Sequence, residues 1–275
     1  MQSIDQFYPY LQKPFKAVII SHQKPDGDAM GSSLALFHFL KKMGHEVSVI
    51  SPTNWASFLN WMPGVEEVID FESNKPKASS LIQNADYIFC LDFNIFHRTK
   101  NVEPLLKEAK AKKILIDHHQ QPDTPSFAYG ISDVTMSSTS EMIYHFIIAS
   151  GSGNILDLDI ATCLYTGIMT DTGSFRFPST SASVHKIVAH LKELGLNHTL
   201  IHENIYDNFS EGRLKFMGNA FLHRMTVLPA LKTALMAIPK TDIYKYELKT
   251  GDTEGLVNYL LSIEGIQLAA IVIDR

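Results

Sequence analysis

The chain has 275 residues, of which 45% are hydrophobic, and this is enough to form one large domain or two smaller ones. Its formal net charge of −5 excludes the broad basic field with which proteins grip long nucleic acid, so we expect a small anionic substrate and no long duplex. The N-terminus lacks a secretory signal and no stretch reaches the ~20 apolar residues of a membrane span, so we expect a cytoplasmic protein with no membrane partner.

The two cysteines, Cys90 and Cys163, both lie in apolar segments and are expected to be buried free thiols. Neither has the polar, electropositive surroundings that activate a thiolate, which argues against cysteine-based catalysis. A Ser/His/Asp triad stays open, although no Gly-x-Ser-x-Gly elbow occurs.

From about residue 15 to residue 195, short β-type runs alternate with helical patterns. The expected strands are Ala17–Ile20, Val47–Ile50, Tyr87–Leu91 and Lys113–Ile116. The first expected helix passes through Leu34, Phe37, Leu40 and Lys41 and ends at Gly44. The later expected helices are Glu103–Ala111, Ser138–Ala149, Ile160–Thr170 and Ala182–Leu194. Alternating strands and helices, with strands that are apolar throughout, predict an α/β fold with a doubly wound parallel sheet covered on both faces.

After Gly195 the pattern changes. Residues 197–215 are polar and helix-prone and predict a helical linker, which leaves 1–196 as the first domain and 216–275 as the second. A strand is expected over Thr226–Ile238, a helix opening near residues 251–255, and a closing strand at Leu268–Ile273. These elements predict a smaller C-terminal α/β domain that looks incomplete.

Charged clusters follow the apolar strands and one helix, where ligands bind in parallel sheets. Four segments carry them: His22, Asp26 and Asp28; Asp92; Asp117, His118 and His119; and Asp171. Carboxylates and imidazoles packed together are costly to desolvate unless a cation compensates them, and Asp171 at a helix C-terminus also opposes the helix dipole. The pattern therefore predicts a two-metal site.

Simpler interpretations exist for some of these features. Pro25-Asp26-Gly27 is also common turn chemistry. Ser138 with Glu141 three residues later favours a capping box, although an anion at that helix N-terminus stays open. His97-Arg98 and Arg176 are candidates for contacts with a substrate phosphate.

The spacing His22-x-x-x-Asp26-x-Asp28, followed by Asp92, Asp117-His118-His119 and Asp171, resembles the motif series of the DHH phosphoesterase superfamily over residues 15–180. Residues 251–259, Gly-Asp-Thr-Glu-Gly-Leu-Val-Asn-Tyr, resemble the start of the DHH-associated C-terminal domain. Within the superfamily the pairing is similar to the nanoRNase/pAp-phosphatase branch, an oligoribonuclease group to which RecJ-like exonucleases are related.

The resemblance implies a role for each motif residue. His22 and Asp26 would hold one metal. Asp28, His118 and Asp171 would hold a second, and Asp92 would bridge the two. His119 would face the scissile phosphate, and Asp117 would orient the ligating imidazoles. The resemblance also implies Mn²⁺, with Mg²⁺ and Co²⁺ as alternatives. Mixed imidazole and carboxylate ligation agrees with Mn²⁺, because Mg²⁺ prefers shells made of oxygen alone.

The function implied is hydrolysis of short oligoribonucleotides and of 3′-phosphoadenosine 5′-phosphate by a metal-activated hydroxide, with His119, Arg98 and Arg176 contacting the substrate. The second domain would bind substrate and is expected to be truncated, since the family's Gly-Gly-Gly-His stretch does not occur before Arg275. Two alternatives are an inorganic pyrophosphatase or exopolyphosphatase of the same superfamily, and a non-catalytic nucleotide-sensing module. The oligomeric state stays open.

Overall fold

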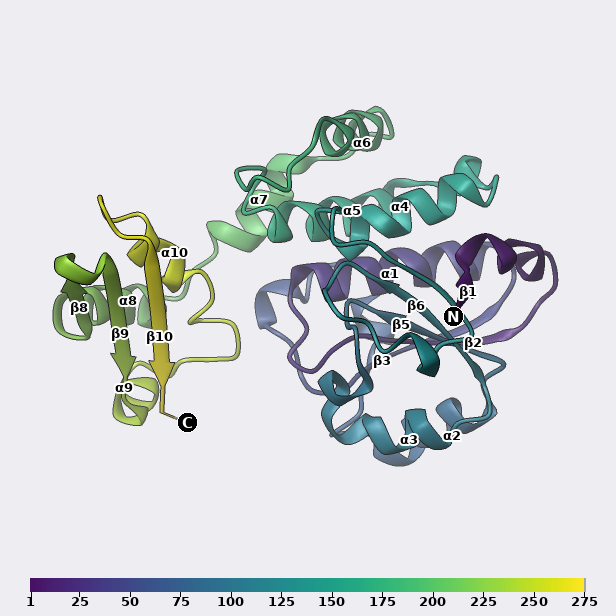
Figure 1. Cartoon of the computed structure of the whole chain (residues 1–275), viewed down its shortest axis with the longest axis horizontal. Helices are drawn as coiled ribbons and strands as arrows, with labels where there is room; N and C mark the ends of the chain where they lie inside the picture. The colour runs from purple at the N-terminus through teal and green to yellow at the C-terminus, as the bar shows by residue number, and fades with distance from the viewer. Residues whose placement is uncertain (275) are drawn as a thin grey trace. The chain divides into compact units, whose positions relative to one another are not determined.

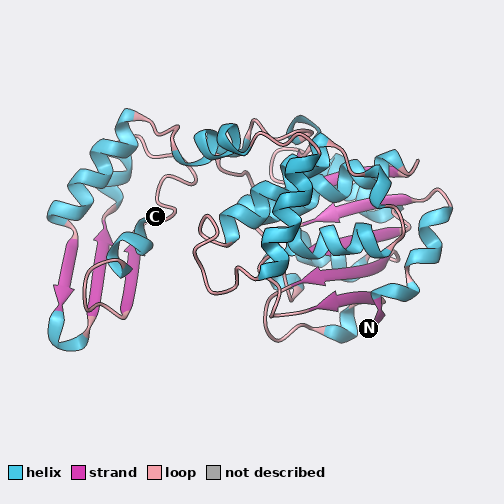
Figure 2. Cartoon of the chain, turned by 90° about the horizontal axis from the view of Figure 1, so that it is seen from above, coloured by secondary structure: helices cyan, strands magenta, loops and turns pink. Residues whose placement is uncertain are grey.

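The computed structural model describes residues 1–274; residue 275, the last of the expected second domain, lies outside the described residues. The chain divides into two compact units. The first consists of residues 1–55 and 59–202, and the second of residues 56–58 and the chain from Glu203 onward. Each unit has its own sheet, and the strands of each sheet lie side by side in Figure 2.

The first unit is built on a seven-stranded sheet in the order β1-β7-β6-β5-β2-β3-β4, in which every pair is parallel. The strands are β1 (Gln2–Ser3), β2 (Lys16–Ile20), β3 (Glu46–Ser51), β4 (Ile69–Asp70), β5 (Tyr87–Leu91), β6 (Lys112–Asp117) and β7 (Tyr129–Ser132). The four expected strands and the parallel sheet are confirmed. The strands that the sequence did not predict, β1, β4 and β7, have two to four residues, too few to carry a hydrophobic pattern.

Helices cover both faces of this sheet, as the apolar strands predict (Figure 1). One face carries α1 (Gly27–Lys42), α4 (Thr139–Ala149) and α5 (Leu158–Asp171), and the other carries α2 (Lys75–Asn84) and α3 (Glu103–Glu108). Beyond α5 follow α6 (Ala182–Glu193) and α7 (His198–Tyr206).

Alternate residues of one strand serve the two faces. Val18 and Ile20 pack with Ala78 and Ile82 of α2, whereas Ile19 points to the other face; all three strand residues are buried. Cys90 is buried in the same cluster, and both cysteines are buried free thiols, as expected.

Helices α1 and α5 approach each other closely because glycine occupies the contact. A Cβ atom added to Gly31 would lie 2.6 Å from the carbonyl oxygen of Cys163, and one added to Gly27 would lie 2.4 Å from Oγ1 of Thr170. The helices therefore run in opposite directions with their backbones nearly in contact. This packing brings the first turn of α1 beside the last turn of α5.

The second unit has a three-stranded sheet in the order β10-β9-β8, with β9 and β10 parallel and β8 and β9 antiparallel. Its elements are α8 (Glu211–His223), β8 (Met225–Leu228), β9 (Thr233–Ile238), α9 (Lys240–Lys245), α10 (Leu256–Leu261) and β10 (Leu268–Ile273). The single strand expected over residues 226–238 was wrong. Pro229 has no N–H for a sheet ladder and begins a turn that ends at Lys232, whose φ is 48°, so two antiparallel strands form instead.

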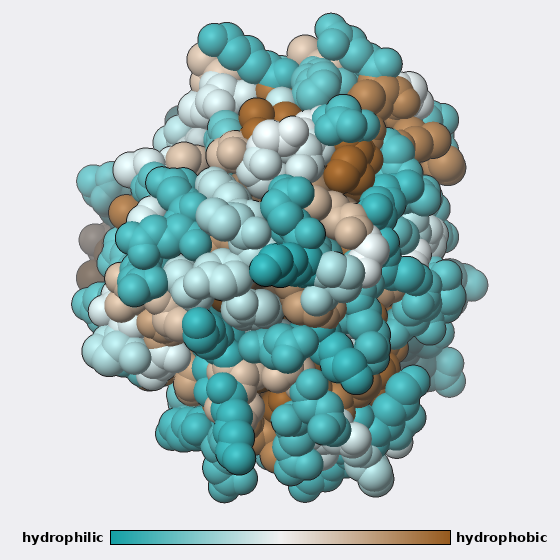
Figure 3. All heavy atoms as spheres, turned by 90° about the vertical axis from the view of Figure 1, so that its right-hand side faces the viewer, coloured by the Kyte–Doolittle hydropathy of each residue, from teal (hydrophilic) through white to brown (hydrophobic). Residues whose placement is uncertain are grey.

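The face drawn in Figure 3 is largely hydrophilic, and its hydrophobic side chains gather in small groups. Within residues 1–274, no helix combines the length and the apolar character that crossing a bilayer requires.

We predict that Gly31→Ala destabilises the first unit by about 1–3 kcal/mol, because the new methyl group must push α1 away from α5. Hydrogen exchange should show the loss of protection in α1 and α5. Gly218→Ala is the control. It lies inside α8 with nothing within 4 Å of an added Cβ, and it should stabilise the protein by about 0.5–1 kcal/mol. Unchanged protection in Gly31→Ala would contradict the close packing.

Candidate metal centre

The predicted ligands meet at the point where the sheet changes direction. On one side of β2, the strands β3 and β4 follow in chain order toward one edge of the sheet. On the other side, the strands β5, β6 and β7 follow in chain order toward the opposite edge. The neighbouring strands β2 and β5 therefore form the switch point, where open α/β sheets leave a crevice for ligands beyond the carboxyl ends of the strands. His22 follows β2, and Asp92 directly follows β5.

Asp26 is both a turn residue and a member of the centre. Its Oδ1 accepts hydrogen bonds from the backbone N–H groups of Asp28 and Ala29, at 3.0 Å each, and so caps α1. Its Oδ2 lies 3.8 Å from Nε2 of His22. Nδ1 of His22 lies 2.8 Å from the carbonyl oxygen of Gln23. A proton on Nδ1 satisfies that contact and leaves the Nε2 lone pair facing the centre.

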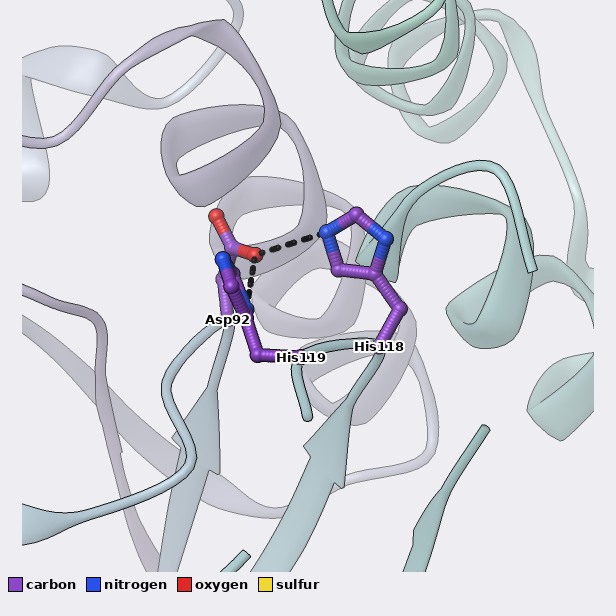
Figure 4. A group of neighbouring side chains, drawn as sticks. All are labelled: Asp92, His118 and His119. Carbon is purple, nitrogen blue, oxygen red and sulfur yellow. Dashed lines mark ion pairs between the residues drawn. The ribbon is translucent and has the colours of Figure 1, made fainter. Parts of the chain in front are cut away.

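Asp92 lies in the middle of the group and is only 2% exposed. Its φ of 63° is in the left-handed region, which aspartate tolerates better than most residues, and its N–H donates to the carbonyl oxygen of Ile116 at 3.2 Å. Oδ2 lies 3.4 Å from Nε2 of His22, and Oδ1 lies 3.5 Å from Nε2 of His118. Figure 4 shows Asp92 facing both His118 and His119. Each oxygen of Asp92 thus lies near a different imidazole, an arrangement expected of a bridging carboxylate.

A second set of donor atoms comes from three segments of the chain, which supply Asp28, His118 and Asp171. Nε2 of His118 lies 3.5 Å from Oδ2 of Asp171, the last residue of α5. Asp28, in the first turn of α1, completes this set, which the close packing of α1 and α5 brings together. Among the described residues, the donor atoms form three groups, and within each group all the atoms lie within 4.8 Å of one another. The groups are His22, Asp26 and Asp92; Asp28, His118 and Asp171; and Asp92, His118 and His119.

The start of α4 supplies contacts that the sequence did not reveal. The hydroxyl of Thr139 donates to Oδ1 of Asp92 at 3.1 Å. The N–H groups of Thr139 and Ser140 donate to the two oxygens of Asp28, at 2.6 and 2.9 Å. The anion at this helix N-terminus is therefore Asp28 itself.

The capping box expected at the same place forms in part, because the Glu141 side chain bonds the N–H of the residue before the N-cap Ser138 and not that of Ser138 itself. Oγ of Ser138 accepts from the N–H of Glu141 at 3.0 Å, and the Glu141 carboxylate accepts from the N–H of Ser137 at 2.7 Å. The sequence signal, Ser-Ser-Thr-Ser-Glu before a helix, indicated this cap. The same sequence did not indicate that the N–H groups of Thr139 and Ser140 would face the carboxylate of Asp28, which lies in a different segment.

Asp117 orients one imidazole of the pair rather than both. Its Oδ1 lies 2.7 Å from Nδ1 of His119, and the carboxylate is fully buried. His118 instead has its Nδ1 3.4 Å from the carbonyl oxygen of Met136. In an extended chain, residues two apart point to the same side, so Asp117 reaches His119 and not His118.

Negative charge is concentrated in this centre. Burial raises the pKa of Asp28 well above its usual range, and the nearby Asp92 and Asp171 raise it further. Burial also raises the pKa of Asp171 to about 6, against the opposing effect of His118. Burial lowers the pKa of His22 and of His118, but hydrogen bonding to Asp92 and the surrounding carboxylates outweigh it and raise the values to about 9 and about 10.

Without a cation, the raised pKa values of His22 and His118 keep both imidazoles protonated beside Asp92, and the raised pKa values of Asp28 and Asp171 reduce the negative charge of the group. A divalent cation supplies the same compensation and turns each imidazole into a neutral donor. The donor set, with its buried carboxylates and Nε2 atoms directed inward, therefore fits divalent metal ions.

The two arginines that the sequence proposed for phosphate contacts lie outside this group. Arg98 is half-buried, and its backbone carbonyl accepts from the N–H of Gln23 at 2.8 Å. Arg176 is exposed, and its Nε–H donates to the carbonyl oxygen of Gly173 at 2.6 Å. In the described part of the chain, neither guanidinium forms a hydrogen bond or an ion pair with the six predicted metal ligands.

Residues 16–168 match the sequence profile of the DHH family, N-terminal domain. The chain is 32% identical over 179 residues to the bifunctional oligoribonuclease and PAP phosphatase NrnA of Thermus thermophilus, a match that covers 65% of this chain and 50% of that protein. It is 25% identical over 260 residues to the Bacillus subtilis protein of the same name, covering 94% of this chain and 77% of that one.

A probable manganese-dependent inorganic pyrophosphatase from Streptococcus equi subsp. equi is 27% identical over 199 residues, which are 65% of this chain and 55% of that protein. Among solved structures, an exopolyphosphatase-related protein from Bacteroides fragilis is similar over 99% of this chain and 79% of its own, with a TM-score of 0.94 and 36% identity. The profile match covers more than half of the chain and includes five of the six predicted ligands. The chain therefore belongs to the DHH family.

Proposed function

We propose that the chain is a metal-dependent phosphoesterase that holds two divalent cations. His22 and Asp26 would hold one, Asp28, His118 and Asp171 the other, and Asp92 would lie between them. The observation that carries this proposal is the placement of Asp92, whose two oxygens lie 3.4 and 3.5 Å from Nε2 of His22 and of His118. Two metals a few Å apart need such a bridging carboxylate.

Manganese is the metal we propose, with Mg²⁺ and Co²⁺ as alternatives. Imidazole ligands suit Mn²⁺ better than Mg²⁺, and the name of the streptococcal relative specifies manganese dependence. When bound, the cations would supply Lewis acidity and lower the pKa of a water molecule so that it attacks phosphorus near neutral pH.

His119 and Asp117 are the catalytic pair in this proposal. The Asp117 carboxylate accepts from Nδ1 of His119 at 2.7 Å, which fixes the orientation of the ring. Nε2 of His119 is then available to donate to a phosphoryl oxygen and to stabilise the charge that develops there. Because His119 also lies near Asp92 and His118, its role needs to be separated from metal binding by experiment.

Short oligoribonucleotides and 3′-phosphoadenosine 5′-phosphate are the substrates we propose. The names of the Thermus and Bacillus relatives support both activities, and the net charge of −5 agrees with a substrate of few phosphates. Residues 1–196 would form the catalytic domain and residues 216–275 a substrate-binding domain, joined by a linker over 197–215. Arg98 and Arg176 would contact substrate phosphates outside the metal centre.

Inorganic pyrophosphate is the second candidate substrate. The streptococcal relative supports it by name, and a pyrophosphatase could use the same metal ligands. A non-catalytic nucleotide sensor has weaker support, because a sensor does not require a complete two-metal centre.

Hydrolysis rates measured on a panel of four substrates test the function directly. With Mn²⁺, a 5′-phosphorylated ribodinucleotide and 3′-phosphoadenosine 5′-phosphate should be hydrolysed faster than pyrophosphate or a ~20-nucleotide DNA. Product release can be followed by chromatography, with excess chelator as the blank. Preferential hydrolysis of pyrophosphate would replace the proposed substrate, and no hydrolysis of any phosphoester would favour the sensor.

Metal binding should stabilise the protein, because only the folded chain gathers the ligands. At Mn²⁺ concentrations about 100 times Kd, we expect a gain of about 2.7 kcal/mol for each occupied site, or roughly 5–10 °C in Tm per site, relative to the protein in chelator. Asp92→Asn should lose most of this shift. Asp70→Asn is the matched control, since Asp70 ends β4 at the same sheet edge but belongs to none of the donor groups.

The same measurement separates the role of His119 from that of the ligands. His119→Gln should keep the Mn²⁺-dependent rise in Tm but lower kcat about 10²- to 10⁴-fold, since it removes a group that acts on the substrate. If the Mn²⁺-dependent rise in Tm of His119→Gln were as small as that of Asp92→Asn, the result would indicate that His119 is a metal ligand.

A further inference from the structure

The segment that follows Asp171 has an unusual backbone. Gly173, Ser174 and Phe175 have φ angles of 56°, 61° and 63°, so three consecutive residues are left-handed. L-residues enter this region mostly one at a time, and a bulky residue such as phenylalanine is strained there. Strained segments of this kind concentrate at ligand-binding and catalytic sites, and here the segment begins beside a predicted metal ligand.

Several contacts hold the turn in place. The N–H of Ser174 donates to the carbonyl oxygen of Met169 at 2.8 Å, and the N–H of Phe175 donates to Oγ1 of Thr172 at 3.1 Å. The ring of Phe175 packs against that of Tyr165, with centroids 5.5 Å apart. The surroundings therefore enforce the left-handed conformation.

The turn folds Phe177 back over Gly173. The N–H of Phe177 donates to the carbonyl oxygen of Thr172 at 3.0 Å, and a Cβ atom added to Gly173 would lie 2.5 Å from Cζ of Phe177. Glycine at residue 173 thus leaves room for the ring. Gly173 is two residues from Asp171, so their Cα atoms are at most about 7.6 Å apart.

Phe177 remains 40% exposed although it is a large apolar side chain near a charged centre. Two other exposed apolar residues lie on loops at the same sheet edge: Ile95, which follows β5 and is 42% exposed, and Val134, which follows β7 and is 57% exposed. Apolar side chains around a polar centre are typical of sites for ligands with both a charged and an apolar part. A nucleotide has both parts, whereas pyrophosphate has no apolar part.

We propose that Phe177 is a specificity-determining residue whose ring stacks on a nucleobase of the substrate while the phosphate lies at the metal centre. The proposal rests on the proposed function and adds to it. Stacking uses the face that every base has, so Phe177 would select substrates that carry a base without selecting among bases. Arg176, directly before it, would lie on the same turn as a phosphate contact.

Kinetics on substrates with and without a base test the proposal. Phe177→Ala should raise KM for a 5′-phosphorylated ribodinucleotide about 5- to 150-fold with little change in kcat, and Phe177→Tyr should restore the wild-type value. For analogues in which one or both bases are removed, the ratio of KM between Phe177→Ala and wild type should fall toward one. Tyr10→Ala is the control, because Tyr10 is 41% exposed but packs on Tyr87 and Tyr129, the first residues of β5 and β7, at the opposite edge.

A KM unchanged by Phe177→Ala, or raised equally for substrates without bases, would overturn the proposal. A binding measurement keeps this result separate from the proposed function. In Mn²⁺-loaded Phe177→Trp, adenosine 5′-monophosphate should quench the added indole fluorescence, measured against the wild-type background from Trp55 and Trp61. If wild type hydrolyses no nucleotide, the proposed function fails, and quenching or its absence still decides whether residue 177 stacks on a base.

Discussion

The buried carboxylate of Asp92 sets the main constraint on this protein. It lies between the imidazoles of His22 and His118, with Asp26, Asp28 and Asp171 close by, and an unpaired cluster of such charges would be too costly to bury. The fold meets this cost in part with hydrogen bonds from Thr139 and from the N-terminus of α4. The remaining charge calls for cations, and that requirement links the packing of the first unit to its chemistry.

The sheet topology explains why these residues meet. Parallel strands end at one edge, and the change of direction between β2 and β5 opens a crevice there. Helices α1 and α5 then contribute one proposed ligand each, Asp28 and Asp171, from ends that glycine lets approach closely. The elements that form the core are therefore the same elements that position the donors, so we expect changes in α1–α5 packing to alter metal binding as well as stability.

Much of the first unit could be predicted because its central strands are apolar on both faces and its helices carry clear caps. Residues such as Asp92 and His118 stood out because each follows such a strand. The short edge strands, and the contact of Asp28 with the start of α4, could not be predicted, since they depend on which segments meet in space. The hairpin around Pro229 could have been predicted, because proline within an apparent strand argues against a continuous one.

The proposed centre would combine two kinds of recognition. Bound metals and the imidazoles would act on a phosphate whatever its substituent, whereas an exposed ring such as Phe177 would act only on a substrate with a base. Relatives named as oligoribonuclease and PAP phosphatase and as inorganic pyrophosphatase both match this chain, and a ring that stacks on a base would favour the nucleotide substrates.

The number of metal ions bound per chain tests the central claim most directly. Equilibrium dialysis against Mn²⁺, followed by elemental analysis, should give two ions per chain for the wild-type protein and fewer than one tightly bound ion for Asp92→Asn. One ion per wild-type chain, or two ions held equally tightly by Asp92→Asn, would contradict a bridging role for Asp92.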